Sequence, residues 1–399
     1  MSRPVTFLCL ASYFKGGAFM RACKELGIRT ILLSTEELRH KDWPWEAIDE
    51  KFFMPDLYKQ PDVTNAVSYL ARERKIDRII PLDDFDVETA ASLREHLRCP
   101  GMGDTTARYF RDKLAMRVQA RDEGIPVPDF VHVLNYEEIN DFVRRVPPPW
   151  VLKPRSEAGA VGIKKIHNSE ELWHWVHSLG DKGSYHLLEA YVPGDVFHVD
   201  SVVYDKEVLF GRAHRYGVPP FNIWNHGGVF SSQTLPLGDP LGDHLLSLNK
   251  KIVKAMGLVR GVTHTEFIRG HDGRVYFLEK AARVGGANID LLVEAASGID
   301  LWKEWARLEL AYLEKKKYKL PKPRKDCAGL LVCLSRDERP DLSGYSDPEV
   351  VWREGKDHHA ALIVASSSAK RVGELIDGYQ HRMTHDVLAV QPPTDKVVH

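Results

Sequence analysis

Residues 263–280 read Thr-His-Thr-Glu-Phe-Ile-Arg-Gly-His-Asp-Gly-Arg-Val-Tyr-Phe-Leu-Glu-Lys. Two runs of alternating apolar residues flank Asp272 and Gly273, and Asp-Gly between such runs is a strong signal for a β-hairpin. If these two residues form the loop, the register places Glu266 directly opposite Glu279. The segment therefore predicts two antiparallel strands with a pair of acidic side chains facing each other.

This predicted pair of carboxylates requires a positive partner. Directly opposed residues bring their Cβ atoms within about 5 Å, where like charges destabilise a sheet. A divalent cation shared by both carboxylates removes the repulsion, and Mg²⁺ bound in this way takes its other ligands from water and substrate phosphates. Two alternatives stay open: the register slips by one residue, or both side chains point into solvent.

Basic groups and a glycine loop that suit phosphates occur elsewhere in the chain. Lys153 lies at a strand end and is held extended by the following proline. The stretch from Ser156 to Gly162, which includes Gly159, could lay backbone N–H groups over a phosphate chain, although a glycine turn between strands looks the same. Arg283 carries a planar guanidinium suited to a phosphoryl group or an anionic substrate, with a surface ion pair as the alternative.

Composition excludes several classes of protein. At roughly 150 residues per domain, 399 residues predict two or three domains. The 55 basic and 56 acidic residues give a net charge of −1, so no global field attracts nucleic acid or a membrane. Five scattered cysteines without a C-x-x-C pair, and the lack of a signal peptide or long apolar run, predict a cytoplasmic soluble protein. The motifs of P-loop NTPases, zincins and α/β-hydrolases are missing.

The first part of the chain alternates strand-like and helix-like segments. Apolar runs at 5–10, 30–33 and 78–82 are separated by amphipathic stretches, which predicts a doubly wound parallel sheet with helices on both faces over residues 1–105. Asp83 and Asp84 follow the third run, at the edge where open sheets bind ligands. They either cap the next helix or recognise a substrate amine.

The rest of the chain divides into a linker and two further lobes. A helix that carries Asp112 and Lys113 ends at the Gly124-Ile-Pro-Val-Pro segment, so residues 106–127 are expected to form a linker helix. Residues 128–190 form a small central lobe and residues 191–399 a C-terminal lobe. Within the latter, a βαβ-like piece at about 325–390 looks like a small closing subdomain.

The order of these elements resembles the ATP-grasp superfamily of carboxylate–amine ligases. The resemblance covers about residues 1–390 and implies an N-terminal parallel-sheet domain, a central α+β lobe, and a C-terminal α+β lobe with an antiparallel sheet. Its most specific parts are Asp112-Lys113, residues 151–154 with the glycine loop, residues 188–194 followed by 197–200, Glu266, and Leu278-Glu279 with residues 283–286.

The resemblance implies a role for each matching position. Lys113 and Lys153 contact ATP phosphates, and the loop with Ser156, Gly159 and Gly162 closes over them. The remaining expected positions are the adenine-binding hinge at Glu189, Ala190 and Val192, with Leu278 against the ring; the Mg²⁺ (or Mn²⁺) carboxylates Glu266 and Glu279; and Arg283 at the acyl phosphate.

Three positions depart from the superfamily pattern. Ala281 replaces an Asn that often completes the metal site, and Ala160 replaces a frequent serine of the phosphate loop. Val196 stands where an acidic residue commonly contacts ribose, so Asp195 or His198 is expected to substitute. These departures keep a non-catalytic nucleotide-binding module open as an alternative function.

The expected activity is an ATP-dependent ligase that joins a carboxylate to an amine through an acyl phosphate and releases ADP and phosphate. Carboxylate phosphorylation without ligation is a further alternative. Because the layout resembles stand-alone L-amino-acid ligases, the expected partners are small acids and amines such as amino acids or short peptides, and a homodimer is plausible. No nucleic acid or membrane is expected. The weakest candidates, for substrate recognition, are Asp83, Asp84, His226 and Gly286.

Overall fold

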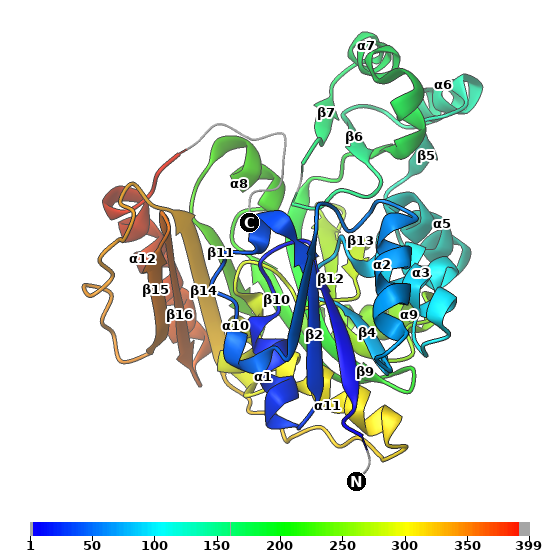
Figure 1. Ribbon diagram of the computed structural model, residues 1–399. Helices are drawn as coiled ribbons and strands as arrows, with labels where there is room; N and C mark the ends of the chain where they lie inside the picture. Colours follow the sequence, from blue (N-terminus) through cyan, green and yellow to red (C-terminus); the bar gives the residue numbers. More distant parts are fainter. Residues whose placement is uncertain (1–2, 160, 391–399) are drawn as a thin grey trace.

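The computed structural model describes residues 3–159 and 161–390 (Figure 1). Its N-terminal part contains a four-stranded parallel sheet in the order β3-β2-β1-β4. Alternate residues of β1 pack on opposite sides. Phe7 and Cys9 join a cluster with helices α1 and α11 (Leu301–Leu313), while Leu8 and Leu10 join a cluster with α2 and α3. The prediction of helices on both faces is thus confirmed. The elements are β1 Thr6–Ala11, α1 Gly17–Glu25, β2 Arg29–Thr35, β3 Glu50–Met54, α2 Asp62–Ala71, β4 Arg78–Pro81 and α3 Val87–Leu97.

A small lobe projects from the body of the molecule at the upper right of Figure 1. Four antiparallel strands in the order β5-β8-β6-β7 carry helices α6 and α7, and the lobe has an apolar cluster of its own around Trp150 and Phe142. Helices α4 Asp104–Arg108 and α5 Lys113–Asp122 precede it. The lobe consists of β5 Phe130–His132, α6 Tyr136–Arg145, β6 Trp150–Pro154, β7 Lys164–Ile166, α7 Ser169–Leu179 and β8 His186–Ala190.

The C-terminal part is built on an eight-stranded antiparallel sheet in the order β13-β12-β9-β10-β11-β14-β16-β15. Helix α9 covers one face, and α10 and α11 pack on the other. These elements are β9 Gly194–Tyr204, β10 Glu207–Tyr216, α8 Pro220–His226, β11 Phe230–Thr234, α9 Pro240–Ala255, β12 Gly261–Gly270, β13 Val275–Ala281, α10 Ile289–Ser297, α11 Leu301–Leu313, β14 Cys327–Leu334, β15 Val350–Lys356, β16 His359–Ser366 and α12 Ala369–Asp386.

The last segment corrects one prediction. Strands β14, β15 and β16 pair antiparallel and extend the large sheet, and α12 follows all three strands. A βαβ unit would place a helix between parallel strands. The βαβ-like interpretation of residues 325–390 is therefore wrong, because alternation in a strand does not reveal the direction of its neighbour.

The two faces of the large sheet have different surroundings. Even-numbered residues of β9 and β12, such as Val202 and Val262, face the cluster shared with the N-terminal sheet, whereas odd-numbered residues such as Phe267 face α9.

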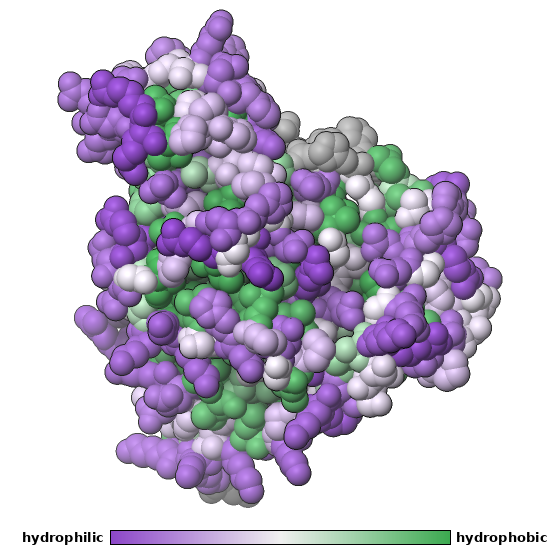
Figure 2. All heavy atoms as spheres, turned by 180° about the vertical axis from the view of Figure 1, so that it is seen from behind, coloured by the Kyte–Doolittle hydropathy of each residue, from purple (hydrophilic) through white to green (hydrophobic). Residues whose placement is uncertain are grey.

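Figure 2 shows the molecule from behind, where hydrophilic residues cover most of the projecting lobe and hydrophobic residues show between them in the middle of the body. None of the helices in the described ranges combines the length and apolar character needed to cross a membrane.

Candidate functional site

The hairpin of β12 and β13 places Glu266 opposite Glu279, as predicted, but by a different route. The turn is longer than two residues: Gly270 N–H donates to Arg274 O (2.9 Å), and Gly273 N–H donates to Gly270 O (2.9 Å). Near the turn, Phe267 consequently pairs with Phe277, one residue out of the expected register. A β-bulge at Leu278 then restores the predicted pairing.

This bulge also decides which face Glu279 occupies. Phe277 lies in the apolar cluster on the α9 side of the sheet. Lys280 points to the same side and donates to Thr263 Oγ1 (3.0 Å) and Thr265 Oγ1 (2.7 Å). Because the bulge adds one residue between Phe277 and Lys280, Glu279 joins Glu266 on the opposite face, toward the N-terminal part.

Lys113 connects this carboxylate pair to the glycine loop. Its Nζ lies 2.9 Å from Glu279 Oε2 and donates to Glu157 O (2.5 Å). The preceding Asp112 caps helix α5 through Leu114 N–H (2.9 Å) and accepts from Arg155 Nε (2.9 Å). Burial opposes ionisation of Glu279, but Lys113 lowers the pKa of that carboxyl below its usual value.

A second group of cations, Lys153 and Arg117, is buried against Glu189 of strand β8. Glu189 forms ion pairs with Lys153 Nζ and with Arg117 Nε, the latter at 3.0 Å. Burial lowers the pKa of Lys153 to about 8. Glu189 opposes this shift, and the nearby positive charge of Arg117 adds to it. Arg117 also donates to Leu278 O and so ties α5 to the bulge. Arg117 was not predicted, because an arginine on an amphipathic helix carries no signal for a partner 72 residues away.

The predicted adenine hinge begins with the last two residues of β8, Glu189 and Ala190. Ala190 N–H donates to Asp129 O (2.8 Å), so this group is already bonded within the protein. Beyond it, Val192 and Leu278 pack against the same apolar cluster. The Glu189 side chain is 4% exposed and fully engaged with the two cations, which leaves only its backbone for the predicted role.

Of the two predicted ribose contacts, His198 requires a correction. Its side chain is 0% exposed, its Nδ1 is bonded to Asp200 Oδ2 (2.7 Å) and its Nε2 to Ser232 Oγ (2.7 Å). Neither ring nitrogen is left for a ligand, so the ribose role predicted for His198 is wrong. Asp195 is half-exposed and lies 3.0 Å from Arg215 Nη2.

The two glycines of the loop predicted to close over the phosphates both have a positive φ. Gly159 has a φ of +66° and open space where a Cβ would stand, and Gly162 has a φ of +70° with Pro154 beside it. The loop is held at its start, where Ser156 O accepts from Arg111. Residue 160 lies outside the described residues, as does the side chain of His226.

Arg283 meets the acidic residues that follow β4. Its Nη2 lies 3.1 Å from Asp84 Oδ2, and Arg111 Nη1 lies 3.7 Å from the same oxygen. Asp83 Oδ2 lies 2.8 Å from Lys15 Nζ. Despite burial, Lys15 and Arg283 lower the pKa of Asp83 to about 2.

These contacts exclude a surface ion pair for Arg283 and capping of α3 by Asp83 or Asp84, while the substrate roles stay predictions. The Arg283–Asp84 ion pair is buried rather than at the surface, with Arg283 13% exposed. The N-cap of α3 is Asp86, which accepts from Ser12 N–H (3.0 Å) instead of capping the helix. A Cβ on Gly286 would lie 3.8 Å from Lys15 Nζ, so Gly286 borders this group.

A buried network lies beside Glu266 that was not predicted. Tyr216 OH donates to Glu266 Oε1 (2.8 Å), and His264 Nε2 lies 3.4 Å from the same oxygen. His264 Nδ1 is 2.9 Å from Asp200 Oδ1. Burial opposes protonation of His264, but Asp200 and Glu266 raise its pKa to about 9. The sequence carries one signal for this network. His198 and Asp200 are two residues apart on β9, and His264 and Glu266 are two apart on β12, so the side chains of each pair share a face of their strand.

His198, Asp200 and His264 lie close enough to share a metal ion. Their ring nitrogens and carboxylate oxygens are, however, already hydrogen-bonded to one another or to Ser232, Tyr216 and Glu266. We therefore interpret the cluster as a support for Glu266.

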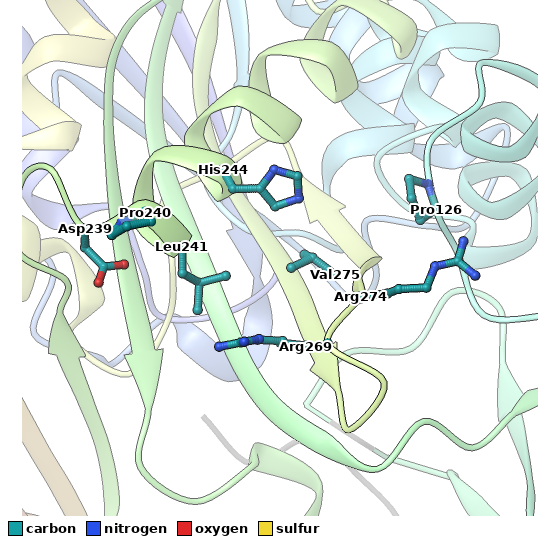
Figure 3. A pocket seen from close by; sticks show the side chains of 9 residues that line it. Pro126, Asp239, Pro240, Leu241, His244, Arg269, Arg274 and Val275 are labelled. Carbon is teal, nitrogen blue, oxygen red and sulfur yellow. The ribbon is translucent and has the colours of Figure 1, made fainter.

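A cavity of about 580 Å³ lies elsewhere, near the loop end of the hairpin (Figure 3). Arg269 and Arg274 from the hairpin and His244 from α9 line it. Arg269 and Glu266 are three residues apart on β12, so their side chains point to opposite faces of the sheet. The cavity is therefore on the other face of the sheet from the carboxylate pair.

Known proteins are similar to this chain in sequence and in fold. No protein-family model matches the sequence. An L-arginine-specific L-amino acid ligase of Bacillus subtilis is 30% identical over 261 residues, 64% of this chain and 63% of that protein, so the match spans less than two thirds of the relative.

The solved structures cover nearly the whole chain. An L-amino acid ligase from Bacillus licheniformis has a TM-score of 0.75 at 17% identity and covers 98% of this chain and 99% of its own. The biotin carboxylase domain dimer of 2-oxoglutarate carboxylase from Hydrogenobacter thermophilus, in complex with MgADP, ADP and bicarbonate, has a TM-score of 0.72 at 18% identity and covers 98% and 92%. The chain therefore shares its fold with these two enzymes along nearly its whole length, and its sequence is similar to that of the Bacillus subtilis ligase over 64% of the chain.

Proposed function

We propose that this protein is an ATP-dependent ligase that joins a carboxylate to an amine through an acyl-phosphate intermediate and releases ADP and phosphate. The observation that carries the proposal is the placement of Glu266 and Glu279 on one sheet face, with Lys113 bound to Glu279. Lys153 and Arg283 add two further cations that interact electrostatically with Glu279. The names of the B. subtilis and B. licheniformis relatives support a ligase.

Mg²⁺ fits the residues at the carboxylate pair. Two carboxylates from neighbouring strands share a face, and carboxylate oxygens are the ligands that Mg²⁺ prefers; they also suit Mn²⁺. When bound, the metal ion supplies charge neutralisation for the triphosphate and the acyl phosphate. Without it, Lys113 supplies the positive charge that Glu279 requires.

The side chains of this chain bind and orient the reactants. Lys113 and Lys153 attract the phosphates, and the Ser156–Gly162 loop covers them with backbone N–H groups. The substrate carboxylate oxygen attacks the γ-phosphorus, and the bond to ADP breaks. Arg283 holds the resulting acyl phosphate through its planar guanidinium while the amine attacks the carbonyl carbon, loses a proton, and expels phosphate.

Amino acids or short peptides are the proposed substrates. Asp83 and Asp84 lie next to Arg283, so a group that binds an ammonium adjoins a group that binds a carboxylate. The name of the B. subtilis relative supports an amino-acid substrate. Gly286 borders Lys15 and belongs to the same proposed recognition region. We also propose a cytoplasmic homodimer, supported by five free cysteines and the dimeric biotin carboxylase neighbour.

The test is release of ADP from Mg-ATP with each amino acid singly and in pairs, with products identified by mass spectrometry. ADP release that depends on both an acid and an amine, with formation of the amide, supports the ligase. The competing proposal is a nucleotide-binding module without turnover, favoured by the buried Ala281 at the metal site. Tight ATP binding with no substrate-dependent ADP would establish that alternative, and ADP release with a carboxylate alone would indicate phosphorylation without ligation.

A further inference from the structure

A second cavity, of about 250 Å³, lies between the N-terminal part and the C-terminal sheet. We call it the arginine cavity because Arg78 and Arg94 from the N-terminal part and Arg260 from the C-terminal part line it. Arg78 begins strand β4, whereas Asp83 and Asp84 follow the other end of that strand. The cavity runs along β4, with Arg78 at the end of the strand that lies away from the proposed ligase site.

Positive charge in the arginine cavity exceeds negative charge. Among the described residues that line it, three are arginines and one, Glu309, is a carboxylate. Glu309 Oε2 lies 2.8 Å from Arg78 Nε and 2.8 Å from Arg260 Nε, so one oxygen serves both guanidiniums. Arg94 donates to backbone carbonyls instead, with its Nε 2.9 Å from Ile79 O.

These guanidiniums are removed from solvent without full neutralisation. Arg78 is 2% exposed and Arg94 8%. Burial lowers the pKa of Arg94 to about 10, with Arg260 and Arg78 adding to the shift and Glu309 opposing it. Buried charges are normally paired, so an excess of this kind indicates a missing anion.

Hydrogen-bond donors also remain. Arg78 donates through Nε to Glu309 and through Nη1 to Asp77 O (2.9 Å), while its buried Nη2 has no partner among the residues that the structure describes. Arg260 donates to Glu309 and, at 3.4 Å, to Pro100 O. Both guanidiniums therefore have N–H groups that could serve a bound oxyanion.

We propose that the arginine cavity binds a small anion of the phosphate type, either free phosphate or the phosphoryl end of a small phosphomonoester. A guanidinium matches phosphate oxygens in charge and geometry. The volume is below the roughly 300 Å³ at which drug-sized ligand pockets begin, which limits the ligand to a small one. Because its walls come from both parts of the chain, the anion would link them. This proposal does not depend on the ligase activity.

The test is calorimetric titration of the full-length chain with inorganic phosphate and, separately, with glycerol 3-phosphate. EDTA is present so that metal-assisted binding at the carboxylate pair does not contribute, and chloride keeps the ionic strength constant. Four proteins are compared: wild type, Arg260→Gln, Thr106→Trp and, as a control at an exposed position of β10, Glu207→Gln. Thr106 lines the cavity, so tryptophan fills the space while all three arginines remain.

We expect wild type and Glu207→Gln to bind the phosphate group equally, and Arg260→Gln and Thr106→Trp to bind it at least tenfold more weakly. Tighter binding of glycerol 3-phosphate than of phosphate, lost in both cavity variants, identifies a phosphomonoester; the reverse order identifies free phosphate. The proposal is overturned if wild type binds neither compound in EDTA, or if Thr106→Trp binds as wild type does.

Discussion

Glu266 and Glu279 are direct partners across β12 and β13. A regular hairpin with this pairing would have a two-residue turn, whereas the turn here is one residue longer. The bulge at Leu278 absorbs the extra residue and turns Glu279 toward the N-terminal part. The carbonyl of Leu278 accepts from Arg117, which also binds Glu189. The sheet face that carries the carboxylate pair and strand β8 are thus linked through one arginine.

The first prediction concerns turnover. Glu279→Gln keeps the shape of the side chain but removes the charge that a divalent cation requires, so substrate-dependent ADP release falls at least about a hundredfold. Glu207→Gln, at an exposed position of β10, is the matched control and keeps wild-type rates. Equal rates in both variants would exclude a role for Glu279 in catalysis.

The second prediction concerns proton uptake on ATP binding. With a pKa of about 8, Lys153 is partly neutral at pH 8.5, and the negative charge of bound phosphates raises that pKa. ATP binding at pH 8.5 therefore takes up as much as about one proton, and uptake fades below pH 7, where the lysine is already charged. Calorimetry of a non-hydrolysable ATP analogue in buffers of different ionisation enthalpy measures this number.

Lys153→Arg is the control for proton uptake, because arginine stays charged throughout this range. The variant should bind the analogue without proton uptake. Undiminished uptake in Lys153→Arg would assign the proton to another group.

The third prediction concerns stability. Arg117→Met removes one of two cations from the buried Glu189, which lowers the free energy of unfolding by about 3 kcal/mol. Arg121→Met, on the same helix but more than half exposed, should cost less than about 1 kcal/mol. Chemical denaturation of the two variants provides the comparison, and similar costs would show that the Arg117–Glu189 contact adds little.

Much of this site follows from the sequence, and the reasons differ between its parts. The Glu266–Glu279 pair was predicted through an assumed two-residue turn, and the result holds because a longer turn and a bulge compensate each other. Lys113, Lys153 and Arg283 were recognised by their motif positions. The contacts of Arg117 with Glu189 and of Arg283 with Asp84 join residues 72 and 199 positions apart, and no local pattern specifies such partners.

Some parts of the fold could likewise be predicted from the sequence and others could not. Alternating strand-like and helix-like segments indicated the parallel sheet, because each strand pairs with neighbours that are near in sequence. The last three strands were misread, since β14 pairs with β11, which lies far back in the chain. Burial of His198 was also missed, because alternation indicates which residues share a face but not whether that face is covered.

The fourth prediction concerns pH. Burial lowers the pKa of Lys280 to about 7, whereas an unfolded lysine titrates near 10.4. Between these values the unfolded chain binds more protons, so the penalty from Lys280 is largest below pH 7 and fades as pH rises. The stability of wild type relative to Lys280→Met should therefore increase by about 1 kcal/mol per pH unit from pH 7.5 to 9. A pH-independent difference in denaturation free energy would contradict the lowered pKa.

Binding of a divalent cation at Glu266 and Glu279 is the central claim, and electron paramagnetic resonance of Mn²⁺ in place of Mg²⁺ tests it most directly. With a non-hydrolysable ATP analogue present, the wild-type protein and Glu207→Gln should bind Mn²⁺ with the same affinity. Glu266→Gln and Glu279→Gln should each bind it at least about tenfold more weakly, because each removes a charged ligand. Wild-type Mn²⁺ affinity in both of these variants would contradict the assignment of this site.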